Sequence, residues 1–380
     1  MVTESPLLLT PGPLTTTKAT KVAMLRDWGS RDKAFIELTA MVRRRLVDLI
    51  NGRNSYTCIP LAGTGTSAIE AMMSTFIHPN SHSLLLINGA YGRRIGKILS
   101  LANKSFIAVE LDESVPFETN AVVHLLDSNS SIDNIILVHC ETTTGLLNPL
   151  PEISAIAKKR KKKLFVDAMS SFGAISIDTS EIEVDAIAAS SNKCLEGVPG
   201  LAFVLAKEIL LNKCAGISNS LTLDLHDQWQ GLEGNGQWRF TPPTQVVAAL
   251  NTALDLLDNE GGIDQRFERY TENCQILVSG MRKLGFHTYL NDQDQAPIIV
   301  TFHMPKDTNF VFQEFYDFLS KKGFLIYPAK LTKHPSFRIG CIGNVMRKDF
   351  EHLLRTIENA LNSLGVKLPL EKSFGKEIEE

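Results

Sequence analysis

Three short apolar runs decide the fold of this 380-residue chain: Lys163-Leu-Phe-Val-Asp167, Ala186-Ile-Ala-Ala-Ser190 and Leu201-Ala-Phe-Val-Leu205. Short, continuous apolar runs of this kind are typical of strands that are buried on both faces of a parallel sheet. Two earlier runs, Ser83–Asn88 and Asn134–His139, have the same character. Together the five runs predict a largely parallel central sheet.

Amphipathic stretches alternate with these runs and read as helices, at Thr66–Ile77, Arg93–Leu101 and Glu152–Arg160. Strands that alternate with helices predict an α/β fold whose mostly parallel sheet has helices on both faces. Chemistry in such folds gathers at the carboxyl ends of the strands. The residues that directly follow each strand are therefore the first candidates for a functional site.

The pattern changes after about residue 244. A long helical region covers 244–259, is interrupted by Gly261-Gly262, and continues over 263–284. Strands then mix with helices, in an order that predicts a second, smaller α+β domain. The strands are expected at 297–302, 324–327 and 336–339, and the helices at 310–321 and 346–364.

Composition narrows the class of protein. The chain is 44% hydrophobic and 21% charged, and 39 basic against 42 acidic residues leave a net charge of −3. These values exclude a disordered chain or a fibre and do not favour binding to nucleic acid or an anionic membrane. The six cysteines form no Cys-x-x-Cys pair, and no secretory signal or membrane-spanning run is recognisable. We therefore expect a cytoplasmic enzyme with reduced thiols.

Two other sequence patterns give only weak evidence for a function, one for nucleic-acid binding and one for a metal site. The basic run Lys158-Lys-Arg-Lys-Lys-Lys163 is the one feature that a nucleic-acid-binding role would rest on, but such runs are usually the solvated end of a helix. His78 and His82 are four residues apart, but Pro79 breaks the helix that such metal-ligand spacing needs. We expect no metal site.

Asp167 and Lys193 follow neighbouring strands, so both side chains can face one ligand. Alone, a lysine here is usually a solvated loop charge and an aspartate a helix N-cap. Small and turn-forming residues surround Lys193, which suits a loop packed around a cofactor. A desolvated lysine amine can form a Schiff base, and a carboxylate can keep the pyridine nitrogen of pyridoxal phosphate protonated. Taken together, the pair favours this cofactor.

Ala62-Gly-Thr-Gly-Thr-Ser67 precedes an amphipathic helix and is a candidate phosphate cradle. Thr64, Gly65 and Thr66 offer hydroxyls and backbone N–H groups at a helix N-terminus, which favours anions. The segment lacks the spacing of a nucleotide P-loop and of a dinucleotide site.

Seven stretches resemble the class V aminotransferases of fold type I, which depend on pyridoxal 5'-phosphate. They are 7–15, 88–94, 139–149, 165–173, 190–200, 238–244 and 337–344. The resemblance implies a homodimer with a large cofactor-binding domain at 21–255 and a small C-terminal domain at 256–380. It also implies that an N-terminal segment, residues 1–20, packs with the small domain.

The same resemblance implies roles for single residues. Lys193 would be the Schiff-base lysine and proton carrier, and Asp167 the partner of the ring nitrogen. Tyr91 would stack on the ring and Thr142 would lie near its hydroxyl, although Tyr91 alone reads equally well as a core aromatic. Glu141, beside Thr142, could be an acid–base group, but its interpretation as a structural hydrogen bonder is favoured.

The remaining roles concern the phosphate and the substrate. Thr64, Gly65 and Thr66 would hold the phosphate, with Thr241 contributed by the neighbouring subunit. Arg338, between two apolar residues on a strand, would bind the acidic end of the substrate.

Within the family, the resemblance is greatest to transaminases that move the amino group of 2-aminoethylphosphonate to pyruvate, giving phosphonoacetaldehyde and alanine. It implies phosphonate degradation with a small-molecule amino donor and pyruvate as substrates. The alternative is an alanine- or serine-glyoxylate aminotransferase of the same class. A cysteine desulfurase fits less well, because Asn192 stands where those enzymes have histidine before the lysine.

Overall fold

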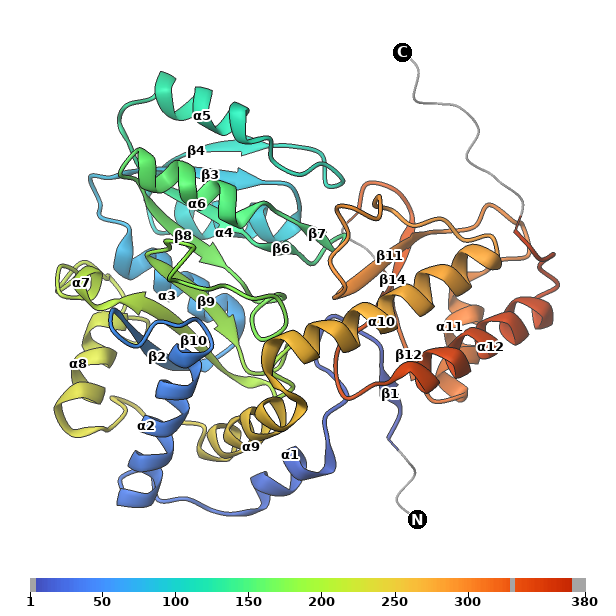
Figure 1. Cartoon of the computed structure of the whole chain (residues 1–380), viewed down its shortest axis with the longest axis horizontal. Coiled ribbons are helices and arrows are strands. Elements are labelled where there is room, and N and C mark those ends of the chain that lie inside the picture. The colour runs from blue at the N-terminus through green and yellow to red at the C-terminus, as the bar shows by residue number, and fades with distance from the viewer. Residues whose placement is uncertain (1–4, 329–331, 371–380) are drawn as a thin grey trace.

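The protein has two lobes, a larger one built on a seven-stranded sheet and a smaller one formed by the last third of the chain (Figure 1). The structure is a computed structural model that describes residues 5–328 and 332–370. Among these residues, no helix is long and apolar enough to span a membrane.

The large sheet has the strand order β2-β10-β9-β8-β5-β3-β4. Its strands are β2 (Tyr56–Gly63), β3 (His82–Ile87), β4 (Ser105–Glu110), β5 (Ile132–Val138), β8 (Lys163–Asp167), β9 (Ala186–Ser190) and β10 (Gly200–Lys207). Strands β9 to β4 are parallel, whereas β10 runs antiparallel to both β9 and β2. The predicted mostly parallel sheet is confirmed, and all five predicted runs are strands of it. The antiparallel direction of β10 was not predicted, because a short apolar run carries no direction.

Two strands of this sheet were not predicted. β2 contains Pro60, which weakens a strand pattern but is tolerated here because β2 is an edge strand. β4 is the other edge and is largely exposed, so it lacks the continuous apolar run of a buried strand.

Helices cover both faces of the sheet, as predicted. One face packs against α2 (Lys33–Asp48), α5 (Thr119–Ser128), α6 (Leu150–Lys159) and α9 (Thr244–Glu260). The other face packs against α3 (Gly65–Phe76), α4 (Ala90–Leu101) and α8 (Leu225–Asn235). Successive residues of one strand enter opposite cores: Leu84 and Leu86 enter the first, Leu85 and Ile87 the second. Shorter elements complete this lobe: α1 (Lys18–Val22), the 3-10 helix η1 (Ala23–Leu25), β6 (Cys140–Glu141), β7 (Leu146–Leu147) and α7 (Glu208–Leu211).

The small lobe begins where α9 ends. Gly261 adopts the left-handed conformation (φ 107°) that terminates α9, and the next helix starts at Gly262. This lobe contains α10 (Gly262–Lys283), β11 (Ile299–His303), α11 (Phe312–Lys321), β12 (Phe324–Leu325), β13 (Tyr327–Pro328), β14 (Ser336–Gly340) and α12 (Arg347–Ser363). An aromatic-rich core fills it.

The predicted single strand at 324–327 is wrong, because the chain changes partner within it. β12 pairs in parallel with β1 (Leu7–Leu8), whereas β13 pairs with β14 in the three-stranded sheet β11-β14-β13. Buried Ile326 lies between the two pieces. The β1–β12 pairing places the start of the chain beside the small lobe (Figure 1).

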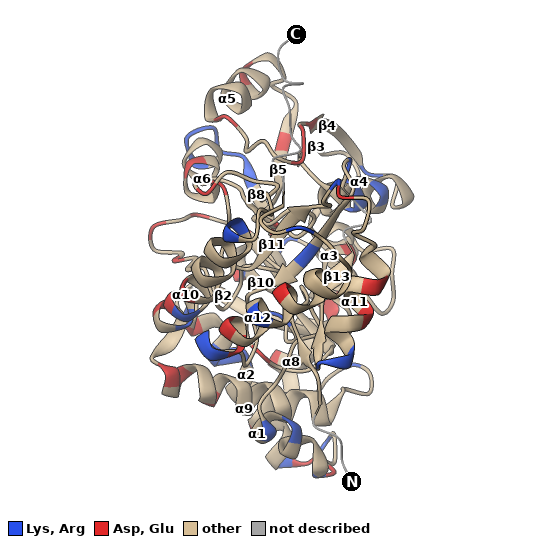
Figure 2. Cartoon of the chain, turned by 90° about the vertical axis from the view of Figure 1, so that its right-hand side faces the viewer, with Lys and Arg blue, Asp and Glu red and all other residues tan. Residues whose placement is uncertain are grey.

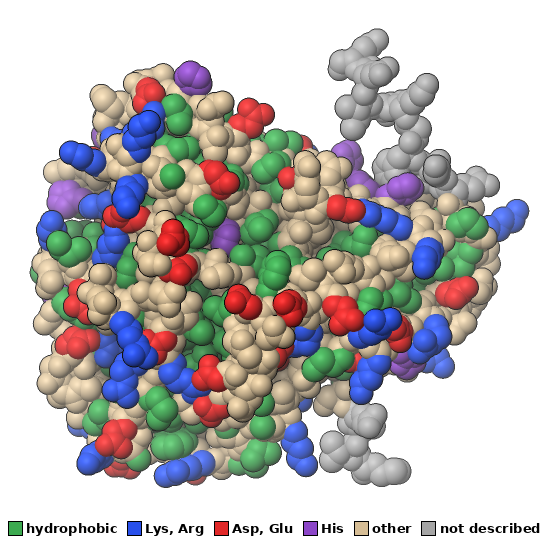
Figure 3. Space-filling view, viewed as in Figure 1, with side chains coloured by type: hydrophobic (Ala, Val, Ile, Leu, Met, Phe, Trp, Pro, Cys, Tyr) green, Lys and Arg blue, Asp and Glu red, His purple; other side chains and the backbone are tan. Residues whose placement is uncertain are grey.

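Basic and acidic residues lie interspersed along the elements of both lobes (Figure 2). On the face shown in Figure 3, hydrophobic side chains also alternate with charged ones. The basic run at the end of α6 is partly paired locally, since Arg160 binds Asp127 at 2.9 Å and Lys158 lies 3.4 Å from Glu183. These contacts agree with the interpretation of the basic run as the solvated end of a helix.

Candidate active site

A cavity of about 200 Å³ lies at the carboxyl ends of β8 and β9 and the N-terminus of α3. Seven of the nine predicted site residues line it: Thr64, Gly65, Thr66, Tyr91, Thr142, Asp167 and Lys193. Chain segments more than 100 residues apart thus meet at one edge of the sheet, as expected for an α/β fold.

Asp167 is the last residue of β8 and its side chain is buried. Its Oδ1 accepts a hydrogen bond from the backbone N–H of Met169 at 3.0 Å, so the carboxylate does stabilise the following turn, although no helix starts there. Burial raises the pKa of Asp167 to about 7, and the negative charge of Glu141 adds to the rise. The carboxylate is therefore a buried anion for which a cationic partner is favourable.

Lys193 lies in the turn between β9 and β10. Burial lowers the pKa of its amine to about 8, and the charges of Arg338 and Arg94 also lower it. Nζ donates a hydrogen bond to the backbone carbonyl of Pro11. The residue after Pro11 is Gly12, whose backbone has a φ of +130° that favours glycine. A Cβ at this position would also lie 2.7 Å from the Lys193 Nζ.

The phosphate cradle is the first turn of α3. Thr64 is the N-cap, and its Oγ1 accepts a hydrogen bond from the Ser67 N–H at 3.3 Å. A Cβ on Gly65 would lie 2.5 Å from the Met169 sulfur, so a larger residue here would require the Met169 side chain to shift. The helix therefore directs its positive end and its backbone N–H groups toward the cavity.

Tyr91 lies in the first turn of α4, and the guanidinium of Arg94 sits 4.6 Å from its ring centroid. Arg94 also lines the cavity and donates a hydrogen bond to Thr66 Oγ1 at 3.3 Å. Sequence reasoning missed Arg94. The signal was available, because residues three apart on a helix share a face. Ser190 and Asn192 also line the cavity and were missed.

Glu141 holds the start of α4 in place. It is fully buried, accepts hydrogen bonds from the N–H groups of Tyr91 and Gly92, both at 3.3 Å, and bonds Thr143 Oγ1 at 2.7 Å. Burial raises its pKa. These contacts match a structural hydrogen bonder.

Arg338 and Thr241 lie outside the cavity lining. Arg338 projects from β14, and its Nη1 donates to the carbonyl of Thr142 at 3.0 Å. Its buried Nε has no hydrogen-bond partner among the described residues, and burial lowers its pKa. A guanidinium in this state favours an incoming anion. Thr241 is exposed in this chain.

The residues fit pyridoxal phosphate. The cavity combines a buried carboxylate with a raised pKa, an amine with a lowered pKa, and a helix N-terminus for a dianionic phosphate. Each of the three groups matches one chemical feature of that cofactor.

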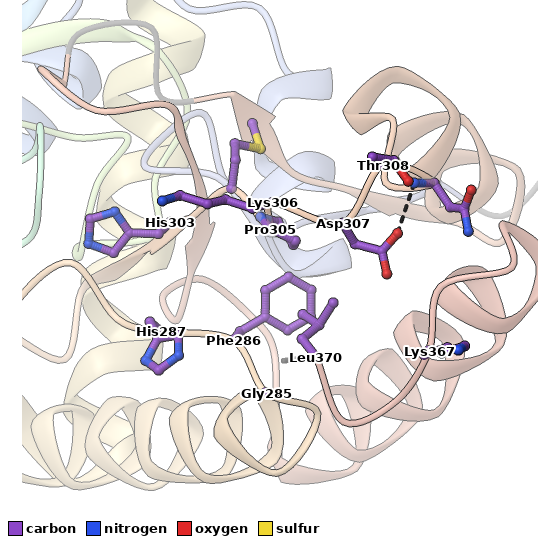
Figure 4. Close-up of a pocket in the computed structure, with 12 residues that line it drawn as sticks. Gly285, Phe286, His287, His303, Pro305, Lys306, Asp307, Thr308, Lys367 and Leu370 are labelled. Atoms are coloured by element: carbon purple, nitrogen blue, oxygen red, sulfur yellow. Dashed lines mark hydrogen bonds between the residues drawn. The ribbon is translucent and has the colours of Figure 1, made fainter. Parts of the chain in front are cut away.

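A larger cavity of about 340 Å³ lies in the small lobe, between the turn at Gly285–His287 and the segment His303–Asn309 (Figure 4). Asp307 accepts a hydrogen bond from the N–H of Asn309 there, at 2.8 Å. Among the described residues that line this cavity, none is a predicted site residue.

One group of potential metal ligands is found outside the cavity. Asp224, His226 and Asp227 bring ligand atoms within 4.8 Å of one another. Asp224 caps α8 and Asp227 pairs with Arg239 at 3.3 Å, so both carboxylates already have structural partners. We assign no metal to them.

Comparison with known proteins identifies the family. The family model Aminotransferase class-V matches residues 17–350. A 2-aminoethylphosphonate–pyruvate transaminase from Pseudomonas fluorescens is 48% identical over 96% of this chain and 99% of its own length. One from Pseudomonas aeruginosa is also 48% identical, over 96% of this chain and 98% of its own.

Solved structures confirm the fold. A ureidoglycine-glyoxylate aminotransferase from Bacillus subtilis superposes with a TM-score of 0.88 at 22% identity and covers 97% of this chain and 96% of its own. A pyridoxamine-pyruvate aminotransferase from Mesorhizobium loti has a TM-score of 0.88 at 23% identity, over 97% and 95%. With its fold and the match over most of its length, this chain belongs to the class V aminotransferases, which depend on pyridoxal phosphate.

Proposed function

We propose that this protein transfers the amino group of 2-aminoethylphosphonate to pyruvate, giving phosphonoacetaldehyde and alanine, in phosphonate degradation. The observation that carries this choice is the 48% identity, over nearly the whole of both chains, to transaminases named for these two substrates. The buried guanidinium of Arg338 supports it, because both substrates carry an acid group that a planar guanidinium binds with two hydrogen bonds.

When bound, pyridoxal phosphate supplies an electron sink that stabilises negative charge on the carbon next to the transferred nitrogen. Asp167 holds the proton on the ring nitrogen, which keeps that sink effective. Lys193 would hold the cofactor through Nζ, and its amine would carry a proton from the substrate carbon. Its lowered pKa of about 8 leaves a useful fraction of free amine near neutral pH.

The other residues bind and orient. Thr64, Gly65 and Thr66 would hold the phosphate at the α3 N-terminus, and Tyr91 would stack on the ring. Thr142, which lines the cavity, would lie near the ring hydroxyl. Its Oγ1 is 2.6 Å from that of Ser170, so the two hydroxyls form one polar pair. Arg338 binds the phosphonate in the first half-reaction and the pyruvate carboxylate in the second.

The working form is a homodimer in the cytoplasm. Exposed Thr241 would reach the phosphate site of the partner subunit, and the exposed ring of Phe240 beside it supports a contact surface there. All six cysteines are buried and unpaired, which supports a reducing compartment.

The deciding experiment supplies purified holoenzyme with pyruvate and follows alanine. 2-Aminoethylphosphonate, serine and glutamate are compared as donors. In a second series glyoxylate replaces pyruvate, alanine is added to the donors, and glycine is followed as the product. We expect alanine to form fastest from 2-aminoethylphosphonate. Faster turnover with serine or alanine as donor and glyoxylate as acceptor would instead favour the alanine- or serine-glyoxylate activity.

A further inference from the structure

A group of four charged residues and one tyrosine, three of them buried and two half-buried, lies behind the Lys193 turn and outside the cavity lining. It consists of Glu196, from the turn itself, Glu260 at the end of α9, and Arg266, Arg269 and Tyr270 of α10. Arg266 and Tyr270 have exposed fractions of 1% and 0%. Two acids balance two bases, which is the condition under which charges persist away from water.

This group holds the Lys193 turn through three hydrogen bonds. Arg266 donates to the carbonyl of Cys194, the residue after the lysine, at 2.8 Å. Glu196 Oε1 accepts from Arg269 at 2.7 Å and from the Tyr270 hydroxyl at 2.6 Å. Glu196 itself adopts a left-handed backbone conformation, with φ +58°, which a non-glycine residue keeps only when its surroundings hold it there.

The same side chains hold the segment that follows the Arg338 strand. The Tyr270 hydroxyl accepts a hydrogen bond from the Gly343 N–H at 3.2 Å. Arg269 donates to the carbonyl of Gly343 at 2.6 Å and to that of Val345 at 3.2 Å. One hydroxyl therefore bonds the lysine turn on one side and the turn after β14 on the other.

We propose that Glu196 is a positioning residue: through Tyr270 and Arg269 it fixes the Lys193 turn relative to the β14 end, and so sets the lysine amine against Arg338. The two side chains must act on opposite ends of one small substrate, yet they come from different lobes. Small errors in such alignment reduce rates strongly while ground-state binding changes little. This inference rests on the proposed roles of Lys193 and Arg338, whatever the amino donor is.

Tyr270→Phe tests the proposal, because it removes one hydroxyl and keeps the ring in the core. The matched control is Tyr289→Phe, since the Tyr289 hydroxyl also bonds a buried glutamate across the lobes, Glu113 at 2.5 Å, but away from the Lys193 turn. We expect Tyr270→Phe to lower kcat about tenfold or more, with KM and cofactor content within about twofold, and to change the visible circular dichroism of the bound cofactor. Tyr289→Phe should leave kcat and the dichroism close to those of the wild type.

A double-mutant cycle adds a second readout. Glu196→Gln keeps a carbonyl acceptor but removes the charge, and its combination with Tyr270→Phe should lose little more activity than the more damaging single variant. If Tyr270→Phe does not fold, Glu196→Gln carries the same kinetic and dichroism test. Three results would overturn the proposal: an unchanged kcat in Tyr270→Phe, equal losses of kcat in Tyr270→Phe and Tyr289→Phe, or additive losses of activity in the double variant of Glu196→Gln and Tyr270→Phe. Failure of the wild type to use 2-aminoethylphosphonate would refute only the proposed substrate, since these measurements use whichever donor the wild type accepts.

Discussion

Arg338 and Thr142 come from different lobes, yet Nη1 of the arginine lies 3.0 Å from the threonine carbonyl. The bond anchors one edge of the guanidinium at the rim of the cofactor cavity. The buried Nε has no hydrogen-bond partner among the described residues. If Arg338 binds the substrate as proposed, the small lobe contributes one cation to a site whose cavity the large lobe builds.

We predict that Arg338→Lys and Arg338→Ala raise KM for both 2-aminoethylphosphonate and pyruvate, with cofactor binding little changed. An ammonium cannot reproduce the planar pair of hydrogen bonds, so transition-state binding should weaken by about 2–4 kcal/mol. Steady-state kinetics of both half-reactions measure this. Arg347→Lys, at an exposed ion pair with Glu351, is the control. Slowing of a single half-reaction would show that Arg338 is not shared by the two acids.

Lys193→Ala should fold and retain cofactor noncovalently but not turn over. The variant lacks both the amine that binds the cofactor and the group that carries the proton. Borohydride reduction of wild-type holoenzyme followed by peptide mapping should label the peptide containing Lys193. Lys97→Ala, an exposed lysine of α4, should remain active and labelled. Substantial activity in Lys193→Ala would refute the assignment.

Asp167 should destabilise the cofactor-free protein above neutral pH. Its pKa is about 7 in the folded state, against an ordinary value of 3.8, so the unfolded chain loses this proton first and stability falls as pH rises from about 4 to 7. Asp167→Asn therefore stabilises the cofactor-free protein at pH 8, by at most ~4 kcal/mol, and has little effect at pH 4. Denaturant unfolding at the two pH values tests this. The same variant should weaken cofactor binding, because the amide carries no charge for the ring nitrogen. If Asp167→Asn stabilised the cofactor-bound protein as well as the cofactor-free protein, the proposed role of Asp167 would be contradicted.

The dimer can be tested by mixing two inactive or weakened proteins. If Thr241 serves the partner's phosphate, a heterodimer of Lys193→Ala and Thr241→Ala contains one site with both residues native. We expect the mixture, after exchange of subunits, to bind cofactor more tightly and turn over faster than either variant alone. Sedimentation that shows an active monomer would exclude a shared site.

Much of the fold follows from local pattern. The parallel strands were visible because burial on both faces demands continuous apolar runs, as in β8 and β9. Edge strand β4 escaped detection because exposure removes that demand. The direction of β10 and the break at Ile326 depend on pairing partners far away in the sequence, so no local pattern reports them.

The features of the candidate site likewise fall into those that the sequence could predict and those that it could not. Asp167 and Lys193 could be predicted because each ends or follows a recognisable strand at the edge where α/β sheets bind ligands. The bond from Lys193 to Pro11 and the contacts of Glu196 with α10 could not, because they join segments with no common periodicity. Roles for Tyr91, Thr142, Thr241 and Arg338 came from family resemblance, and the structure supplies their surroundings.

The pairing of β1 with β12 also orders events on the ribosome. Leu7 is among the first residues made, but its partner Phe324 follows more than 300 residues later. The sheet of the large lobe is complete in sequence by Lys207, so it can fold while the nascent N-terminal segment still has no strand to join. The β1–β12 pairing that fixes the segment containing Pro11, whose carbonyl accepts a hydrogen bond from the Lys193 amine, can therefore form only near the end of translation. The large sheet can therefore form early, whereas the segment that contacts Lys193 is fixed late.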